Sequence, residues 1–127
     1  MLKNKSYLNY LIGEAINDVS VDVSTFSQLT KAAEDESTTV MSVNTQILFN
    51  QYRLDIYNKM EIIGRINVHI KDLVGLRVID INETNEMAEL FFDNGFKLVI
   101  DLINEAGTID PETMCLQGPD NLIVVWD

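Results

Sequence analysis

The sequence predicts a β-dominated α+β fold, a mainly antiparallel sheet of about seven or eight strands with two or three short helices. Three observations support this fold class: runs in which apolar and polar residues alternate, turn-forming residues between the runs, and blocks that recur in the same order in both halves of the chain. A length of 127 residues fits a single domain spanning 1–127.

The recurring blocks indicate two pseudo-repeats, at about 11–70 and about 73–126. Each block joins aliphatic residues to a glycine or to a turn. The matched pairs are LIGEAINDV at 11–19 with LVGLRVIDI at 73–81, FNQYRLDI at 49–56 with FDNGFKLVI at 92–100, and MEIIGRINVHI at 60–70 with MCLQGPDNLIVVW at 114–126. Because two copies are too few for a solenoid, we expect one fused domain.

The second repeat contains the clearest strands. In LRVIDIN, at 76–82, Ile79 and Ile81 alternate with Asp80 and Asn82, and NETNE at 82–86 forms the next turn. In the run that follows, DNG at 93–95 accepts positive φ angles and predicts a tight antiparallel hairpin. The side chains expected to face the core on either side of that hairpin are Leu90, Phe92, Phe96, Leu98, Ile100 and Leu102.

The first repeat has a weaker hairpin and the chain ends in a strand. The turn at 50–51 is Asn-Gln, which forms turns less readily than Asn-Gly. RINVHI at 65–70 alternates as a strand does. The final run NLIVVWD, at 121–127, is β-branched and aromatic, which predicts a central or well-covered strand.

Helices are expected at three places. Residues 29–36, LTKAAEDE, contain good helix formers with Ser27 or Thr25 as N-cap, so a helix at about 28–36 is inserted in the first repeat. Asp110 and Pro111 fit an N-cap and first position of one short turn. Residues 3–10 are expected to form a short helix against the sheet.

The negative charge is concentrated in the second half of the chain. Residues 1–77 hold nine acids and eight bases, a net charge of −1, whereas residues 78–127 hold eleven acids and only Lys97, a net charge of −10. This field repels nucleic acid and anionic membrane surfaces and favours a basic protein partner. The alternative is that the acidity only maintains solubility.

No constellation of residues predicts catalysis, a metal site or a cofactor, so we expect no enzyme. The only histidine, His69, lies in a predicted strand and is expected to be a structural or surface residue. Cys115 lies in the apolar run MCL and is expected to be buried and inert. One Cys and one His cannot make a structural zinc site. NETNE lacks the spacing of a calcium loop. The lone glycines Gly13 and Gly75 are expected at strand entries or bulges.

The outward face of the second repeat is the candidate binding surface. If the hairpin strands bury one face, their other face carries acids around two apolar side chains, Phe91 and Val99. An aromatic anchor ringed by acids suits a basic partner. The alternative is that the N-terminal segment or the helix at 29–36 covers Phe91 and Val99. The predicted partner-binding residues are Asp80, Asn82, Glu89, Phe91, Asp93, Val99 and Asp101.

The second repeat also resembles a known group of proteins. The pattern L-x-G-x-x-V-x-x-I at 73–81, then L-x-F-x-N-G-x-x-L-x-I at 90–100 and VVW at 124–126, resembles small β-rich bacterial immunity proteins of polymorphic and contact-dependent toxin systems. The likeness is best over 73–126 and looser over 11–70. It implies a cytoplasmic inhibitor without catalysis, which neutralises a cognate toxin domain, commonly a basic nuclease. It identifies no binding residue.

The leading hypothesis is therefore an acidic immunity or inhibitor protein, a monomer or homodimer, that binds a basic toxin domain. Two alternatives stay open: a non-catalytic homo-oligomeric adaptor or phage-derived binding protein, and an enzyme with a carboxylate site. The single cysteine cannot form an internal disulfide, and no apolar run of eighteen residues and no signal peptide is evident, so we expect a cytoplasmic protein.

Overall fold

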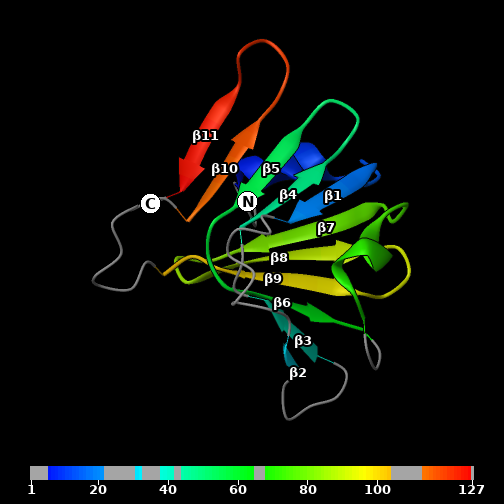
Figure 1. Ribbon diagram of the computed structural model, residues 1–127. Helices are drawn as coiled ribbons and strands as arrows, with labels where there is room; N and C mark the ends of the chain where they lie inside the picture. Colours follow the sequence, from blue (N-terminus) through cyan, green and yellow to red (C-terminus); the bar gives the residue numbers. More distant parts are fainter. Residues whose placement is uncertain are drawn as a thin grey trace.

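The described part of the chain folds into two antiparallel sheets (Figure 1). The computed structural model describes residues 6–21, 31–32, 38–41, 44–64, 68–103 and 113–126. Within these ranges the chain forms eleven strands and two short 3₁₀-helices, η1 (Tyr7–Leu11) and η3 (Ile70–Leu73). The β-dominated antiparallel fold is thus confirmed, with more strands than expected and with two sheets in place of one. None of the described helices is long and apolar enough to cross a membrane.

The two sheets differ by one strand. In spatial order, the five-stranded sheet consists of β1 (Asp18–Val21), β4 (Thr45–Leu48), β5 (Arg53–Ile56), β10 (Met114–Gln117) and β11 (Ile123–Trp126). The six-stranded sheet consists of β2 (Lys31–Ala32), β3 (Thr38–Met41), β6 (Met60–Ile63), β9 (Lys97–Asp101), β8 (Met87–Phe92) and β7 (Val78–Glu83).

The three predicted hairpins are present. Phe49 N donates to Tyr52 O at 2.8 Å between β4 and β5, and Phe92 N donates to Phe96 O at 2.9 Å between β8 and β9. Gly95 has φ +92°, which only glycine adopts without strain, so the DNG turn depends on it. Thr84 N donates to Met87 O at 2.8 Å in the turn between β7 and β8.

Each sheet combines three strands in an equivalent order from one half of the chain with strands from the other half. The five-stranded sheet receives β10 and β11, and the six-stranded sheet receives β6, β3 and β2. The neighbours β1, β4 and β5 in one sheet correspond in order to β7, β8 and β9 in the other. The next strand then crosses over: β6 follows β5 along the chain but pairs with β9, and β10 follows β9 but pairs with β5. This exchange interlocks the two halves around one core.

The segments that enter β1 and β7 lie against each other (Figure 1). Each follows a 3₁₀-helix, and Ala15 and Arg77 form an isolated antiparallel bridge. Gly13 N donates to Val78 O and Gly75 N donates to Ile16 O, both at 2.8 Å. Gly13 and Gly75 therefore mark strand entries, as the sequence predicts.

The core lies between the inner faces of the two sheets. Phe92, Leu90 and Leu98 of the second half are almost fully buried, as the alternation predicts. The other sheet contributes residues such as Ile47 and Leu54. Removing apolar side chains of this size from water is the dominant stabilisation of such a fold, at about 1.5–3 kcal/mol each.

Several expected elements are wrong. Lys31–Ala32, expected in a helix at 29–36, form strand β2 against β3, so pairing overrides the helix propensity there. Residues 68–70 are no strand, because His69 caps η3. Ile79 is 55% exposed because a bulge between Val78 and Asp80 interrupts the alternation. The last strand, β11, is not central: it lies at an edge of its sheet with Ile123 65% exposed.

The other helix predictions have mixed outcomes. The N-terminal segment forms the 3₁₀-helix η1, with Ser6 as its N-cap: Ser6 Oγ accepts a hydrogen bond from Leu8 N at 2.9 Å. The turn expected at Asp110 and Pro111 lies outside the described residues.

Candidate acidic binding face

The face of the six-stranded sheet opposite the core, here called the outer face, is the candidate functional surface. Strand alternation and register place its side chains in rows across β7, β8, β9 and β6. One row runs from Asn82 through Glu89 and Val99 to Glu61. The adjacent row runs from Asp80 through Phe91 to Lys97. These residues come from both halves of the chain, because β6 belongs to the first.

A polar network fixes the centre of the outer face. Asn82 Nδ2 donates to Glu89 Oε1 at 2.9 Å, and Lys97 Nζ lies 3.1 Å from Glu89 Oε2. The same ammonium lies 5.7 Å from the centre of the Phe91 ring, within the range of a cation–π contact. Lys97 therefore contacts both Glu89 and the partly exposed Phe91 ring, and these contacts favour the observed orientation of the ring.

The hydrogen bond from Asn82 lowers the pKa of the Glu89 carboxyl below its ordinary value. Partial burial opposes the shift, and the hydrogen bond and positive charge of Lys97 add to it. Glu89 therefore stays ionised at neutral pH. The outer face keeps its negative charge even though one carboxylate is paired with a lysine.

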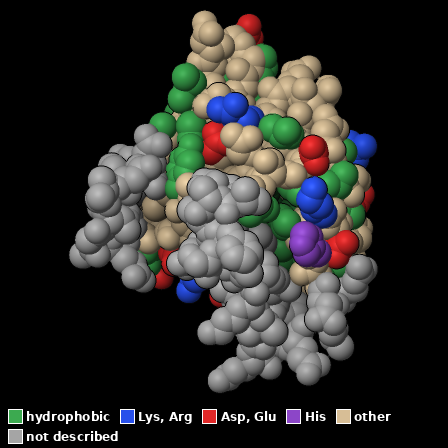
Figure 2. Space-filling model, in the orientation of Figure 1, with side chains coloured by type: hydrophobic (Ala, Val, Ile, Leu, Met, Phe, Trp, Pro, Cys, Tyr) green, Lys and Arg blue, Asp and Glu red, His purple; other side chains and the backbone are tan. Residues whose placement is uncertain are grey.

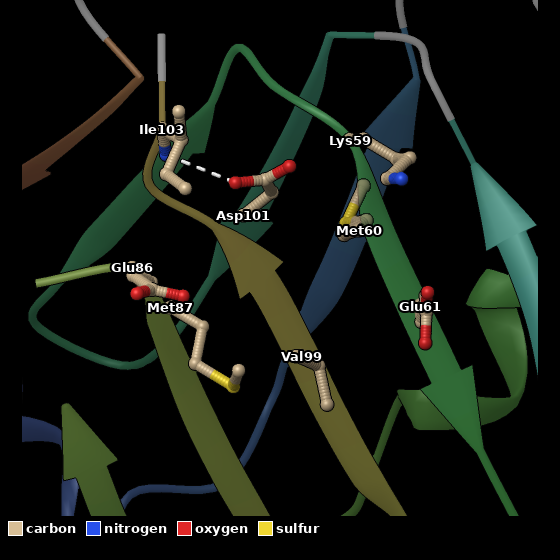
Figure 3. A pocket seen from close by; sticks show the side chains of 8 residues that line it. All are labelled: Lys59, Met60, Glu61, Glu86, Met87, Val99, Asp101 and Ile103. Carbon is tan, nitrogen blue, oxygen red and sulfur yellow. Dashed lines mark hydrogen bonds between the residues drawn. The ribbon is translucent and has the colours of Figure 1, made fainter. Parts of the chain in front are cut away.

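A hollow of about 290 Å³ opens at one end of the outer face (Figure 3). In Figure 3, Val99 of β9 lies between Met87 on one side and Glu61 on the other. Charged and apolar side chains alternate around it. Its lining residues are Lys59, Met60, Glu61, Glu86, Met87, Val99, Asp101 and Ile103.

Backbone contacts hold the rim of this hollow from both sides. Asp101 N donates to Lys59 O, and Leu102 N donates to Glu86 O, both at 2.9 Å. Asn58 Nδ2 donates to the carbonyl oxygens of Asp101 and Ile103, again at 2.9 Å. Asp101 Oδ1 in turn accepts a hydrogen bond from Ile103 N at 2.9 Å. The hollow is therefore part of the folded framework and needs no partner to form it.

The exposed apolar side chains near the hollow distinguish it from an ordinary solvated face. Ile103 is 49% exposed, Met87 is exposed, and Phe91 and Val99 are half-buried. On the side of the molecule seen in Figure 2, the described surface carries hydrophobic, acidic and basic side chains interspersed. Exposed apolar side chains that gather at one place, as at this hollow, are a feature of protein-interaction sites.

The structure brings together six of the seven residues predicted to bind a partner. Asp80, Asn82, Glu89, Phe91, Val99 and Asp101 share the outer face. Asp93 does not. It lies in the turn after β8, where its N–H donates to Arg77 O at 3.0 Å, so it caps the entry to β7.

Sequence reasoning missed Lys59, Glu61, Met87 and Ile103, which line the hollow. The alternation in MEII, at 60–63, indicates that Glu61 faces away from the core. The pairing of β6 with β9 was the missing information, since it joins segments far apart in the sequence.

The two residues considered for thiol chemistry lie on different elements. Cys115 is buried in β10, as predicted. His69 is exposed and caps η3: its Nδ1 accepts from Lys71 N at 3.2 Å, while Asp72 Oδ2 accepts from His69 N at 2.9 Å. Across the described ranges, no group of three or more His, Cys, Asp or Glu side chains is arranged to hold a metal ion.

Comparison with protein-family models, with curated proteins and with solved structures finds no match for this chain.

Proposed function

We propose that this chain is an inhibitor of the immunity type, which acts in the cytoplasm by binding a basic protein, a toxin domain with nuclease activity, through the outer face of its six-stranded sheet. The observation that carries the proposal is the Phe91 ring, half-buried and oriented by Lys97 in a face rich in acids. A ring whose orientation is already favoured in the free protein can bury area on a partner with a smaller loss of side-chain freedom.

The charge distribution supports a basic partner. Residues 78–127 carry a net charge of −10, and β7, β8 and β9 all lie in that half. Exposed acids such as Asp80 and Glu86 would attract a basic domain over distances near the Debye length, about 8–10 Å at physiological salt. The charges would raise the association rate, and burial of Phe91 would slow dissociation.

The partner can be sought among neighbouring gene products. Co-expression with the product of the gene immediately upstream, followed by pull-down at low and high salt, should yield a complex whose association slows as salt increases. The upstream product alone should arrest growth, and this chain should restore it. Absence of toxicity together with absence of a complex would contradict the immunity function for that pair.

Matched variants locate the interface once a complex is in hand. Phe91→Ala should weaken binding by more than about 1 kcal/mol, whereas Leu48→Ala, at the corresponding position in β4, should not. Asp80→Asn should lower the association rate, and Asp18→Asn should serve as its control. Asp18 and Asp80 are both exposed, and in each the Oδ1 atom accepts from the next backbone N–H, at 2.8 and 2.9 Å. Equal effects of the paired variants would exclude the outer face.

A homo-oligomeric adaptor is the second candidate, and strand β11 favours it. This edge strand, IVVW, contains no charge, and Ile123 and Val125 are exposed. An uncharged apolar edge is a template for pairing with a second copy. Sedimentation of the protein alone, with Val125→Lys as the variant, tests this: an oligomer that the lysine dissociates would support the adaptor.

We also infer that the chain is an internal pseudo-repeat, with 11–70 and 73–126 as its units. The equivalent strand orders and the paired entries at Gly13 and Gly75 support this inference. So does a pair of close contacts at equivalent places. A Cβ atom on Gly64 would lie 2.5 Å from the Phe96 ring, and one on Gly118 would lie 2.7 Å from the Tyr52 ring.

A further inference from the structure

The face of the five-stranded sheet that points away from the core contains a second hollow, of about 320 Å³. The proposed function does not use this hollow. It lies on the other sheet from the candidate surface described above, the outer face of the six-stranded sheet. Its lining is polar and mostly uncharged. The residues around it are Ser20, Asn44, Thr45, Gln46, Asp55 and Tyr57.

Asp55 is the exceptional residue of this hollow. It lies in β5, the central strand of its sheet, and is only 3% exposed. Its Oδ2 atom lies 3.2 Å from Arg53 Nε, but its Oδ1 atom is buried and accepts no hydrogen bond from the part of the chain that the structure describes. Buried polar atoms in folded proteins almost always form hydrogen bonds. A buried carboxylate oxygen without one is therefore unusual and requires an explanation.

Arg53 compensates the buried charge only in part. Its side chain is considerably exposed, and the 3.2 Å contact is longer than the 2.7–2.9 Å typical of a strong charge-assisted hydrogen bond, by about 0.3–0.5 Å. The remaining oxygen is therefore an acceptor with excess negative charge in a poorly hydrated place. The group that would stabilise it most is a cationic N–H donor.

The equivalent position on the six-stranded sheet is occupied by Val99, and the comparison shows that a carboxylate at Asp55 is unusual. Asp55 pairs with Gln46 on β4 and with Cys115 on β10, just as Val99 pairs with Glu89 on β8 and with Glu61 on β6. The first hollow thus has a valine where the second has a carboxylate. This arrangement of strands does not require a carboxylate at this position, because the other sheet forms the same pairing with Val99 there.

We propose that this hollow is a binding site for an alkylammonium or alkylguanidinium group, whose N–H donates to Asp55 Oδ1. Ser20, Asn44 and Gln46 carry side-chain oxygens around the hollow that can accept the cation's other N–H groups. The cation can belong to a free small molecule or to a lysine or arginine side chain of a protein. The site is independent of the inhibitor function proposed above.

Chemical-shift mapping of the isotopically labelled protein tests the site directly. Methylammonium and methylguanidinium chlorides are the probes, titrated at constant ionic strength, with uncharged N-methylacetamide as the control. The expected result is saturable shifts at the amides of Gln46, Asp55 and Tyr57 with at least one cation, and none with N-methylacetamide. Shifts confined to the outer face of the six-stranded sheet, or no saturable shifts around Asp55, would overturn the proposal.

A matched pair of variants adds a second criterion. Asp55→Asn keeps the shape of the side chain but removes its charge, and should weaken cation binding by about tenfold or more. Asp18→Asn, an exposed acid of the same sheet, should leave it unchanged. Equal affinity in wild type and Asp55→Asn would contradict the assignment. Should Asp55→Asn fail to fold, the wild-type shift map still decides.

A peptide distinguishes the two sources of the cation. Acetyl-Gly-Arg-Gly-amide presents a guanidinium on a backbone, as a partner protein would. Shifts at the same amides, with affinity at least equal to that of methylguanidinium, would indicate a protein side chain as the occupant. Binding of the small cations without binding of the peptide would indicate a free small molecule.

Discussion

Trp126 Nε1 donates a hydrogen bond to Glu83 Oε2 at 2.9 Å and thereby ties the last strand of the five-stranded sheet to β7 of the six-stranded sheet. Glu83 Oε1 also accepts a hydrogen bond from the Ser6 hydroxyl, just before η1. One partly buried carboxylate therefore joins three segments that are far apart in the sequence. Glu83 lies outside both candidate binding surfaces, and its hydrogen bonds stabilise the fold.

Replacing Glu83 by alanine should destabilise the protein by about 1–3 kcal/mol, because it leaves the Trp126 and Ser6 donors without their acceptor. Urea unfolding followed by fluorescence measures this, since Trp126 is the only tryptophan. Its emission should also shift to the red in the folded variant. Glu86→Ala, which removes an exposed acid of the neighbouring turn, is the control and should change the unfolding free energy by less than about 0.5 kcal/mol. Equal effects of both variants would contradict the role assigned to Glu83.

Gly64 and Gly118 each lie against an aromatic ring, and alanine at either position should destabilise the protein by about 1–3 kcal/mol through overpacking. The ring carbons of Phe96 and Tyr52 would lie at 2.5 and 2.7 Å from the added Cβ atoms, well inside van der Waals contact. Urea unfolding of the single variants and of Gly64→Ala combined with Phe96→Leu measures the clash. The smaller leucine should recover part of the loss, so that the two changes are not additive. Additive losses would show that Gly64 is required for another reason.

The pKa of Glu89 should move toward its ordinary value in Asn82→Ala, because the hydrogen bond from Asn82 is the largest cause of its depression. A carboxyl whose pKa is lower in the folded than in the unfolded state stabilises the fold above the unfolded value, about 4.3 for Glu, and this contribution is lost as pH falls through the folded value. Wild type should therefore lose more stability than Asn82→Ala on acidification below that pH. Carbon-13 NMR titration of the Glu89 carboxyl measures the shift directly. An unchanged pKa in Asn82→Ala would exclude Asn82 as its cause.

Local sequence chemistry predicted the hairpins and the inward and outward sides of their strands. Asn94-Gly95 fixes one turn, and the alternation then orients the side chains of β8 and β9 on either side of it. The failures arise where distant pairing decides. Lys31 and Ala32 favour a helix by composition, but β3 pairs with them. The bulge at Ile79 shifts the alternation by one residue, and no glycine or proline at that place in the sequence predicts it.

The candidate site was likewise predicted only in part from the sequence. Six of its residues follow from alternation within β7, β8 and β9, and Asp93 was misplaced because alternation stops at the turn. The hollow itself requires β6, which arrives beside β9 by crossing from the other half. Asp55 was not singled out for the same reason. Its burial depends on the neighbours that β4 and β10 supply, and only the strand order reveals them.

Replacing Lys97 by glutamine should speed association with a basic partner while costing little stability. The substitution removes the cation that pairs with Glu89 and lies over Phe91, so the outer face of the six-stranded sheet becomes more negative by one charge. The Lys97–Glu89 contact is worth about 0–1 kcal/mol, as expected for a partly exposed pair. Stopped-flow association at several salt concentrations should show a faster and more salt-dependent rate, and urea unfolding should show the small stability change. Lys71→Gln alters the net charge equally but lies in η3, so it should raise the rate less. A slower association of Lys97→Gln would mean that Lys97 itself contacts an acid of the partner, which would contradict steering by this face.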